Sequence, residues 1–184
     1  MRTFVAIEIP LGVKEKIEEA ISPFAKLNLA ISWVKSKNLH LTLKFSGEVD
    51  EKRIDDMILS LSQALKEEKR FKMSLKDLGV FPDLRRPRVI WIGIDKGKEN
   101  LIRVQGKIEQ ELSKLGFPKE EREFSPHLTV ARVKSPKGIE RLTEQIKNVN
   151  FVAEDIEVDE VVLMRSQLHP QGAIYTPIRK FKLK

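Results

Sequence analysis

Two short stretches of the chain, HLTLKF at residues 40–45 and SPHLTVAR at residues 125–132, each carry a histidine with a threonine two positions later. The sequence holds 3 histidines, and two of them, His40 and His127, belong to this motif. Both stretches are apolar with alternating character, which predicts β-strands. Because residues i and i+2 of a strand point to the same face, each motif presents an imidazole beside a hydroxyl and sends the intervening leucine into the core.

The segments that precede the two motifs repeat in order and in length. A β-prone apolar run lies at residues 4–9 and again at residues 91–95, and a helical pattern fills the gap before each motif. The two predicted helices bury similar apolar faces, formed by Val13, Ile17, Ala20, Ile21 and Phe24 and by Leu101, Val104, Ile108, Leu112 and Leu115. Gly116 is a suitable stop for the second helix.

A second helix and a further strand are predicted after each motif. Asp50 can cap a helix with a buried face of Ile54, Met57, Ile58, Leu61 and Leu65. Ser135, followed by Pro136, opens the corresponding helix, with a face of Ile139, Leu142 and Ile146. The strands follow near Phe71–Leu78 and Asn150–Ile156. The same order of elements therefore occurs twice, which indicates an internal duplication of about 80 residues. We predict a single domain over residues 1–184 made of paired lobes, with pseudo-repeats at about 2–80 and 88–157 and a closing hairpin at 158–184.

The bulk properties set loose bounds on the class of protein. A chain of 184 residues can bury a core, and the lack of cysteine excludes disulfides, thiol nucleophiles and thiolate metal sites. The sequence has no signal-peptide pattern and no long apolar segment, so we expect a cytoplasmic protein without a membrane span. The net charge of +7 favours a polyanionic partner. The abundance of Lys and Glu is the bias of heat-adapted, thermophilic proteins.

The segment PDLRRPR at residues 82–88 separates the two halves. Its prolines and arginines are poor core material, so one interpretation is a solvated linker. The other is a phosphate-contacting loop, because guanidinium groups pair well with phosphate oxygens. The sequence leaves both interpretations open.

Two histidine–threonine pairs suit acid–base catalysis on a phosphodiester. Because the unperturbed pKa of an imidazole is about 6.5, one ring can be neutral and take a proton while another is protonated and gives one. The threonine hydroxyls can donate to an oxyanion that gains charge in the transition state. A strained 2′,3′-cyclic phosphate fits this device, since ring strain favours opening without a metal-activated water. We therefore expect neither a metal nor a cofactor.

The motifs and their surroundings resemble the two-histidine phosphoesterase superfamily, and within it the RNA 2′,3′-cyclic phosphodiesterases, also called 2′-5′ RNA ligases. The resemblance covers nearly the whole chain. Besides the motifs, it is carried by RTFVAI at 2–7, Trp33-Val34, Asn38-Leu39, Phe45, Gly47-Glu48, PRVIW at 87–91, FSP at 124–126, Leu163, Ser166, Leu168, Gly172 and Tyr175. Ser46 departs from the pattern, because the family usually has a large apolar residue there, and this puts the local packing in question.

The resemblance implies a fold and an activity. The fold would be α+β, bilobal and internally duplicated, with two antiparallel sheets facing a central cleft and helices on their outer faces. The activity would be hydrolysis of RNA 2′,3′-cyclic phosphate ends to 2′-phosphates, with reversible 2′-5′ RNA ligation as a side activity. We expect the partners to be RNA ends or nucleotides that carry this phosphate, tRNA fragments among them, and the protein to be a monomer.

Carried over to this chain, the resemblance makes His40 the proton donor to the departing 3′ oxygen and His127 the proton acceptor from water. Spacing alone leaves open which histidine takes which role. Three further residues, Thr42, Thr129 and Arg132, would bind phosphate, and Phe45 and Tyr175 are candidates for stacking on a nucleobase. Strict alternation puts Arg132 on the face opposite Thr129, so Arg132 reaches the site only if the strand ends, bends or bulges there.

Two alternatives use the same histidines differently. A metal-dependent phosphoesterase could use His40 and His127 as ligands, but such sites need three or four ligands and neither motif offers an acid on its face. A non-catalytic module that binds RNA ends could retain the same cleft. Elsewhere, His169 precedes a proline in an expected turn and is interpreted as a loop residue. Trp33 and Trp91 are interpreted as core residues.

Overall fold

Both motif stretches form strands in the computed structural model, which describes residues 1–170 and 172–184. The first motif lies in β3 (His40–Glu48) and the second in β6 (His127–Val133), and in each case the histidine is the first residue of its strand. The β-prone runs that precede them form β1 (Arg2–Glu8) and β5 (Val89–Ile94). Each motif strand pairs with the preceding run in antiparallel fashion, β3 with β1 and β6 with β5.

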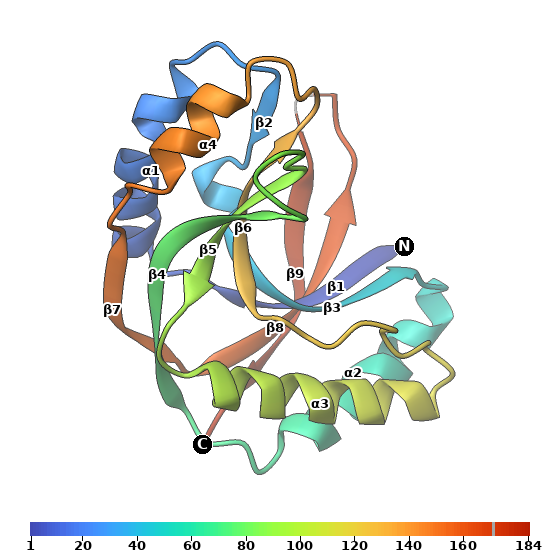
Figure 1. Cartoon of the computed structure of the whole chain (residues 1–184). Coiled ribbons are helices and arrows are strands. Elements are labelled where there is room, and N and C mark those ends of the chain that lie inside the picture. The colour runs from blue at the N-terminus through green and yellow to red at the C-terminus, as the bar shows by residue number, and fades with distance from the viewer. Residues whose placement is uncertain (171) are drawn as a thin grey trace.

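The strands form two antiparallel sheets (Figure 1). Sheet A has the order β3-β1-β8-β9, where β8 is Glu160–Gln167 and β9 is Ile174–Lys182. Sheet B has the order β2-β6-β5-β4-β7, where β2 is Ile31–Trp33, β4 is Phe71–Phe81 and β7 is Val152–Val158. The predicted α+β class with two antiparallel sheets is confirmed.

The four α-helices of the described residues follow the predicted apolar faces. They are α1 (Leu11–Ala25), α2 (Ile54–Leu65), α3 (Lys98–Lys114) and α4 (Glu140–Ile146), and short 3₁₀ turns lie at Ser36–Asn38 and Glu51–Arg53. Asp50 caps the turn that leads into α2, because its carboxylate accepts from the Lys52 N–H at 3.0 Å. Gly116 has a φ of 81°, which ends α3 as predicted. In Figure 1, α1 and α4 lie toward the side of β7, and α2 and α3 lie below β3 and β8.

One helix begins later than the sequence predicts. Ser135 and Pro136 form a turn, in which Ile139 N–H donates to the Pro136 carbonyl at 3.2 Å, and α4 begins only at Glu140. Gly138 explains the delay, since its φ of 74° is left-handed and incompatible with an α-helix. The predicted buried face of Ile139, Leu142 and Ile146 is nevertheless correct.

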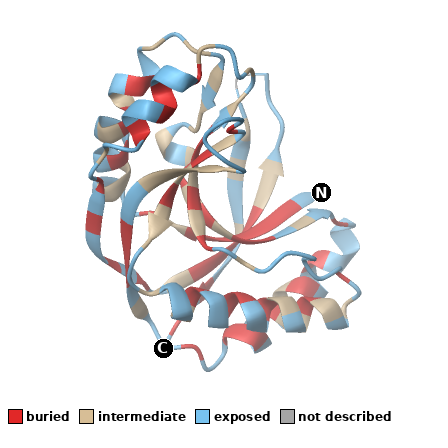
Figure 2. Cartoon of the chain, viewed as in Figure 1, coloured by how far each residue is buried: buried red, intermediate tan, exposed pale blue. Residues whose placement is uncertain are grey.

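The two sheets exchange strands between the two halves of the sequence. β4 follows α2 in the chain, yet it pairs with β5 and β7 in sheet B. The C-terminal strands β8 and β9 form a hairpin and join sheet A through the pairing of β8 with β1. A single large core of buried residues therefore draws on both sheets, as the red segments of Figure 2 indicate. This exchange fixes the motif strands relative to each other.

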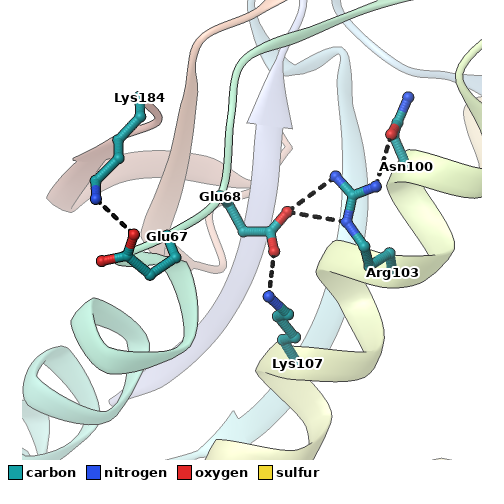
Figure 3. A network of polar contacts seen from close by, with 6 residues as sticks. All are labelled: Glu67, Glu68, Asn100, Arg103, Lys107 and Lys184. Carbon is teal, nitrogen blue, oxygen red and sulfur yellow. Dashed lines mark hydrogen bonds and ion pairs between the residues drawn. The ribbon is translucent and has the colours of Figure 1, made fainter.

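Charged side chains connect the segment just after α2 to the C-terminus and to α3 (Figure 3). Glu68 has a side chain that is only 3% exposed, and its carboxylate accepts from Arg103 Nη2 at 3.0 Å and pairs with Lys107 Nζ at 2.5 Å. Burial alone would raise the pKa of Glu68, but the hydrogen bonds from Lys107 and Arg103 outweigh it and lower that pKa. The neighbouring Glu67 pairs with Lys184 at 2.6 Å. Networks of this kind stabilise proteins most at high temperature.

Among the residues that the structure describes, none of the helices combines the length and the apolar character that a membrane crossing requires.

Candidate active site

The two motif strands bulge at the same place. In β3, Thr42 faces Ala6 but Lys44 faces Val5, so Leu43 is an extra residue. In β6, Thr129 faces Trp91 and Ala131 faces Ile90, which makes Val130 the extra residue. An added residue breaks the alternation of a strand, and two consecutive side chains can then turn to one face. Consistent with this, Leu43 and Lys44 are both buried, and so are Val130 and Ala131.

The bulges bring the next residue of each strand back to the threonine face. In sheet A that residue is Phe45, whose ring centroid lies 6.1 Å from that of Phe4, itself a neighbour of His40. In sheet B it is Arg132, which is exposed and faces Val89 of β5. Strict alternation would put Arg132 on the face opposite Thr129, and the bulge at Val130 returns it to the face of Thr129. Phe45 and Arg132 occupy equivalent positions in the two halves.

Both histidines are held by the same hydrogen bond. His40 Nδ1 lies 2.7 Å from the Asn38 carbonyl oxygen, and His127 Nδ1 lies 2.7 Å from the Ser125 carbonyl oxygen. A carbonyl can only accept, so Nδ1 must carry the proton in each ring. Each Nε2 is therefore left to accept a proton when its ring is neutral, or to donate one when the ring is charged.

His40 lies in an apolar environment. Its ring centroid is 4.7 Å from that of Phe4 and 5.1 Å from that of Tyr175, which meets it edge-on. The site-facing side of sheet A carries a separate apolar cluster of Phe4, Ala6, Val162 and Met164, with Tyr175 against it. Burial, with a smaller contribution from the Lys14 charge, lowers the pKa of His40 and outweighs the hydrogen bond to Asn38. Without a ligand, the ring is mainly neutral at pH 7, and a bound phosphate anion would raise its pKa.

His127 also has aromatic neighbours, contributed by sheet B. The Phe81 ring meets it edge-on with centroids 5.1 Å apart, and Phe81 packs in turn on Trp91 at 5.0 Å. Gly79 leaves room for the indole, because a Cβ there would come within 2.3 Å of the Trp91 ring. Trp91 is half-buried, and its indole N–H is enclosed without a hydrogen-bond acceptor among the described protein atoms. Trp91 thus packs on Phe81, which contacts His127.

Asn38 links the first histidine to the closing hairpin. Its carbonyl accepts from His40 Nδ1, and its side-chain Nδ2 donates to the Ala173 carbonyl at 2.7 Å. The position of His40 is therefore coupled to the turn between β8 and β9. In the sequence, Asn38 stands out only through the family resemblance, and neither Asn38 nor the aromatic neighbours Phe4 and Phe81 could be assigned to the site from spacing.

Three further predicted site residues lie on strands β3, β6 and β9. Thr42 and Thr129 are half-buried on the histidine faces of their strands, and Tyr175 is half-buried against His40. Between the two sheets, the most extensive strand contact is that of β3 with β6. Two surface hollows are formed elsewhere, and neither includes a motif residue. One is lined by residues 7–10 and 157–160, and the other by Ser62, Leu65, Lys66 and residues 179–182.

The sequence also led to predictions for three residues outside the motifs, namely Ser46, His169 and Trp33. Ser46 is half-buried, and its hydroxyl is enclosed without a hydrogen-bond partner in the described part of the chain. His169 lies in the turn after β8, where its carbonyl accepts from the Gly172 N–H at 2.9 Å. Trp33 packs against the main core as predicted. No group of three or more possible metal ligands from His, Asp and Glu occurs within the described residues.

The fold and the paired motif strands define a protein of the two-histidine phosphoesterase class. Comparison with known families makes the assignment specific. The chain belongs to the 2′-5′ RNA ligase superfamily, whose model matches residues 13–170.

Similar proteins agree with this assignment over the full length. A Methanocaldococcus jannaschii protein named RNA 2′,3′-cyclic phosphodiesterase is 39% identical over 184 residues, covering 98% of this chain and 100% of its own. A Methanothermobacter thermautotrophicus protein of the same name is 34% identical, covering 100% and 99%. Among solved structures, a Thermus thermophilus protein superposes with a TM-score of 0.82 at 28% identity, covering 100% and 98%. The E. coli LigT structure with 3′-AMP has a TM-score of 0.76 at 27% identity, covering 99% and 97%. Together these similarities support a phosphoesterase function.

Proposed function

We propose that this protein hydrolyses RNA 2′,3′-cyclic phosphate ends to 2′-phosphates by metal-independent catalysis with two histidines. The observation that carries the proposal is the matched anchoring of the two rings. Both Nδ1 atoms donate to backbone carbonyls at 2.7 Å, which leaves both Nε2 atoms for chemistry. Relatives named RNA 2′,3′-cyclic phosphodiesterase support the substrate class.

In the proposed reaction, His127 Nε2 takes a proton from a water molecule, and the water oxygen forms a bond to phosphorus. The bond from phosphorus to the 3′ oxygen breaks, and His40 Nε2 gives its proton to that oxygen. The phosphate remains on the 2′ oxygen. The lowered pKa of His40 makes its charged form scarce in the free protein, so the bound phosphate must help to charge it. When a 5′-hydroxyl takes the place of water, the same two proton transfers operate, the bond from phosphorus to the 3′ oxygen breaks, and a 2′-5′ linkage forms. Cleavage of that linkage is the reverse reaction, in which the two rings exchange roles.

The neighbouring side chains would stabilise the transition state. The hydroxyls of Thr42 and Thr129 can donate to the non-bridging oxygens as these gain charge. Arg132, on the threonine face after the bulge, can offset that charge. On the other strand, Phe45 is 56% exposed and, with Tyr175, offers an aromatic surface for the base. We further propose that the protein acts as a cytoplasmic monomer on RNA ends, tRNA fragments among them.

The test is turnover of a 2′,3′-cyclic nucleotide in the presence of EDTA. We expect full activity with the chelator and a 2′-phosphate as the sole product, identified by phosphorus NMR. Loss of activity with EDTA that added metal restores, or formation of a 3′-phosphate, would contradict the mechanism. If the wild-type protein turns nothing over but binds RNA ends even after both histidines are replaced by alanine, the chain is a binding module instead.

A further inference from the structure

The loop between β4 and β5, residues 82–88, is attached at its base to the second motif strand (Figure 1, green loop). Arg88 N–H donates to the Phe81 carbonyl at 2.7 Å, which closes the loop. The Phe81 ring, at the start of the loop, contacts the His127 ring. At the other end, the Arg88 carbonyl accepts from the Val133 N–H at 2.9 Å, next to Arg132. The loop therefore extends directly from the wall of the site.

The loop contains a hydrogen-bonded turn formed by the Asp83 side chain. Asp83 accepts from the backbone N–H groups of Arg85 at 2.8 Å and of Arg86 at 3.0 Å, which is the geometry of an Asx turn. These two hydrogen bonds, that from Arg86 first, lower the pKa of Asp83. Pro87 is buried. The backbone amides thus satisfy the one acidic side chain of the loop.

The three arginines of the loop keep their guanidinium groups available. Arg85, Arg86 and Arg88 are exposed, and within the described residues their side chains form no hydrogen bond or ion pair. Three arginines elsewhere do have partners, because Arg53 donates to the Leu115 carbonyl, Arg70 pairs with Glu157 and Arg103 pairs with Glu68. The loop is distinctive in that it carries three exposed guanidinium groups within four residues. A cluster of exposed guanidinium groups without ion pairs is suited to phosphates, which Arg can bind through two parallel hydrogen bonds.

We infer that the loop at residues 82–88 binds backbone phosphates of the RNA chain that leads to the cyclic phosphate end. This inference rests on the proposed function, since it takes the terminal phosphate to lie beside His127. A mononucleotide has no such additional phosphates. The loop would therefore make a cyclic-phosphate-ended oligoribonucleotide the better substrate, and it would favour RNA ends over small cyclic nucleotides.

The test compares two substrates, 2′,3′-cyclic AMP and a ten-nucleotide RNA with a 2′,3′-cyclic phosphate end. The loop variant is Arg85→Gln/Arg86→Gln. The matched control, Arg141→Gln/Lys147→Gln, removes the same charge from exposed positions in and just after α4. We expect the ratio of kcat/KM for the oligonucleotide to kcat/KM for the mononucleotide to fall about tenfold in the loop variant and to hold in the control.

Salt dependence provides a second readout. Each phosphate contact to a single strand contributes about 0.7 to the slope of log kcat/KM against log salt, so the loop variant should lose about 1.4 of the slope for the oligonucleotide. An unchanged substrate ratio and an unchanged slope would overturn the inference while leaving the proposed function intact. If the wild type turns over neither substrate, the proposed function fails, and the loop is judged by the affinity for the same RNA from fluorescence anisotropy. Equal affinities of wild type and loop variant would then overturn it.

Discussion

The two motif strands share a local geometry but differ in their surroundings. In both, Nδ1 of the histidine is anchored 2.7 Å from the carbonyl oxygen two residues earlier, and a bulge follows the threonine. His40, however, is enclosed by Phe4 and Tyr175, whereas His127 is contacted edge-on by Phe81, which precedes the loop at residues 82–88. The equivalent backbones therefore place the two imidazoles in unequal environments, and burial lowers the pKa of His40.

The strands differ again just after the bulge. In the first half the buried position is Lys44, whose ammonium pairs with Glu109 at 2.6 Å and donates to the Pro118 carbonyl at 2.9 Å. In the second half the equivalent position is Ala131, which is fully buried among apolar residues. The first motif is therefore tied to α3 by a buried ion pair, whereas Ala131 at the equivalent position of the second motif contributes apolar packing. This difference predicts that the two halves respond differently to substitution.

Replacing either histidine should have the largest effect on activity. We expect His40→Ala and His127→Ala each to lower kcat/KM for a 2′,3′-cyclic nucleotide by about 10²–10⁴-fold, because each removes one proton transfer. The double variant should lose little more, since the rings act as a unit. His169→Ala is the control and should retain activity. Near-normal rates for either single variant, with folding verified by circular dichroism, would refute the assignment.

Copying the second motif into the first tests the role of the ion pair. Lys44→Ala should lower the free energy of unfolding by about 3 kcal/mol, because Glu109 would stay in its 12% exposed site without its cation. Lys72→Ala breaks the exposed pair with Asp155 and should cost no more than about 1 kcal/mol. Urea denaturation measures both. Equal losses would show that the pair contributes no more than a surface contact.

Local patterns in the sequence predicted the elements but not their partners. Alternation and helical periodicity depend on neighbours in the chain, so the strands, the helices and the shared face of each histidine and threonine could be predicted. The bulges after Thr42 and Thr129 could not, because register depends on the strands alongside. For the same reason the sequence did not reveal that β4 joins sheet B, nor that Asn38 contacts Ala173. The extent of each pseudo-repeat stays a prediction.

The lowered pKa of His40 should set the acidic limb of the pH profile. Activity requires one neutral and one charged ring, and both become charged when the pH falls below the lower pKa of the pair. The acidic limb of kcat/KM should therefore lie below about 6.5, and bound substrate should shift the corresponding limb of kcat to higher pH. NMR titration of the imidazoles measures the pKa of His40 directly. A flat profile between about pH 5 and 8, or a His40 pKa at or above 6.5, would contradict the account.

Ser46 should give the smallest effect, and one of opposite sign. Its enclosed hydroxyl lacks a partner among the described residues, so Ser46→Ala should raise the free energy of unfolding by about 1 kcal/mol. Ser60 provides the control, since its hydroxyl donates to the Glu111 carbonyl at 3.1 Å and its removal should be destabilising by a similar amount. Thermal unfolding of both variants measures the difference. If Ser46→Ala destabilises as much as Ser60→Ala, the Ser46 hydroxyl is satisfied in solution.

The central claim is that two distant imidazoles act on one phosphorus atom, and a crystal structure with a bound 2′-phosphorylated nucleotide tests it most directly. The account predicts one phosphate with oxygens at hydrogen-bonding distance, about 2.7–3.2 Å, from Nε2 of both His40 and His127. A phosphate that contacts only one of the two rings, or that binds away from both, would contradict it.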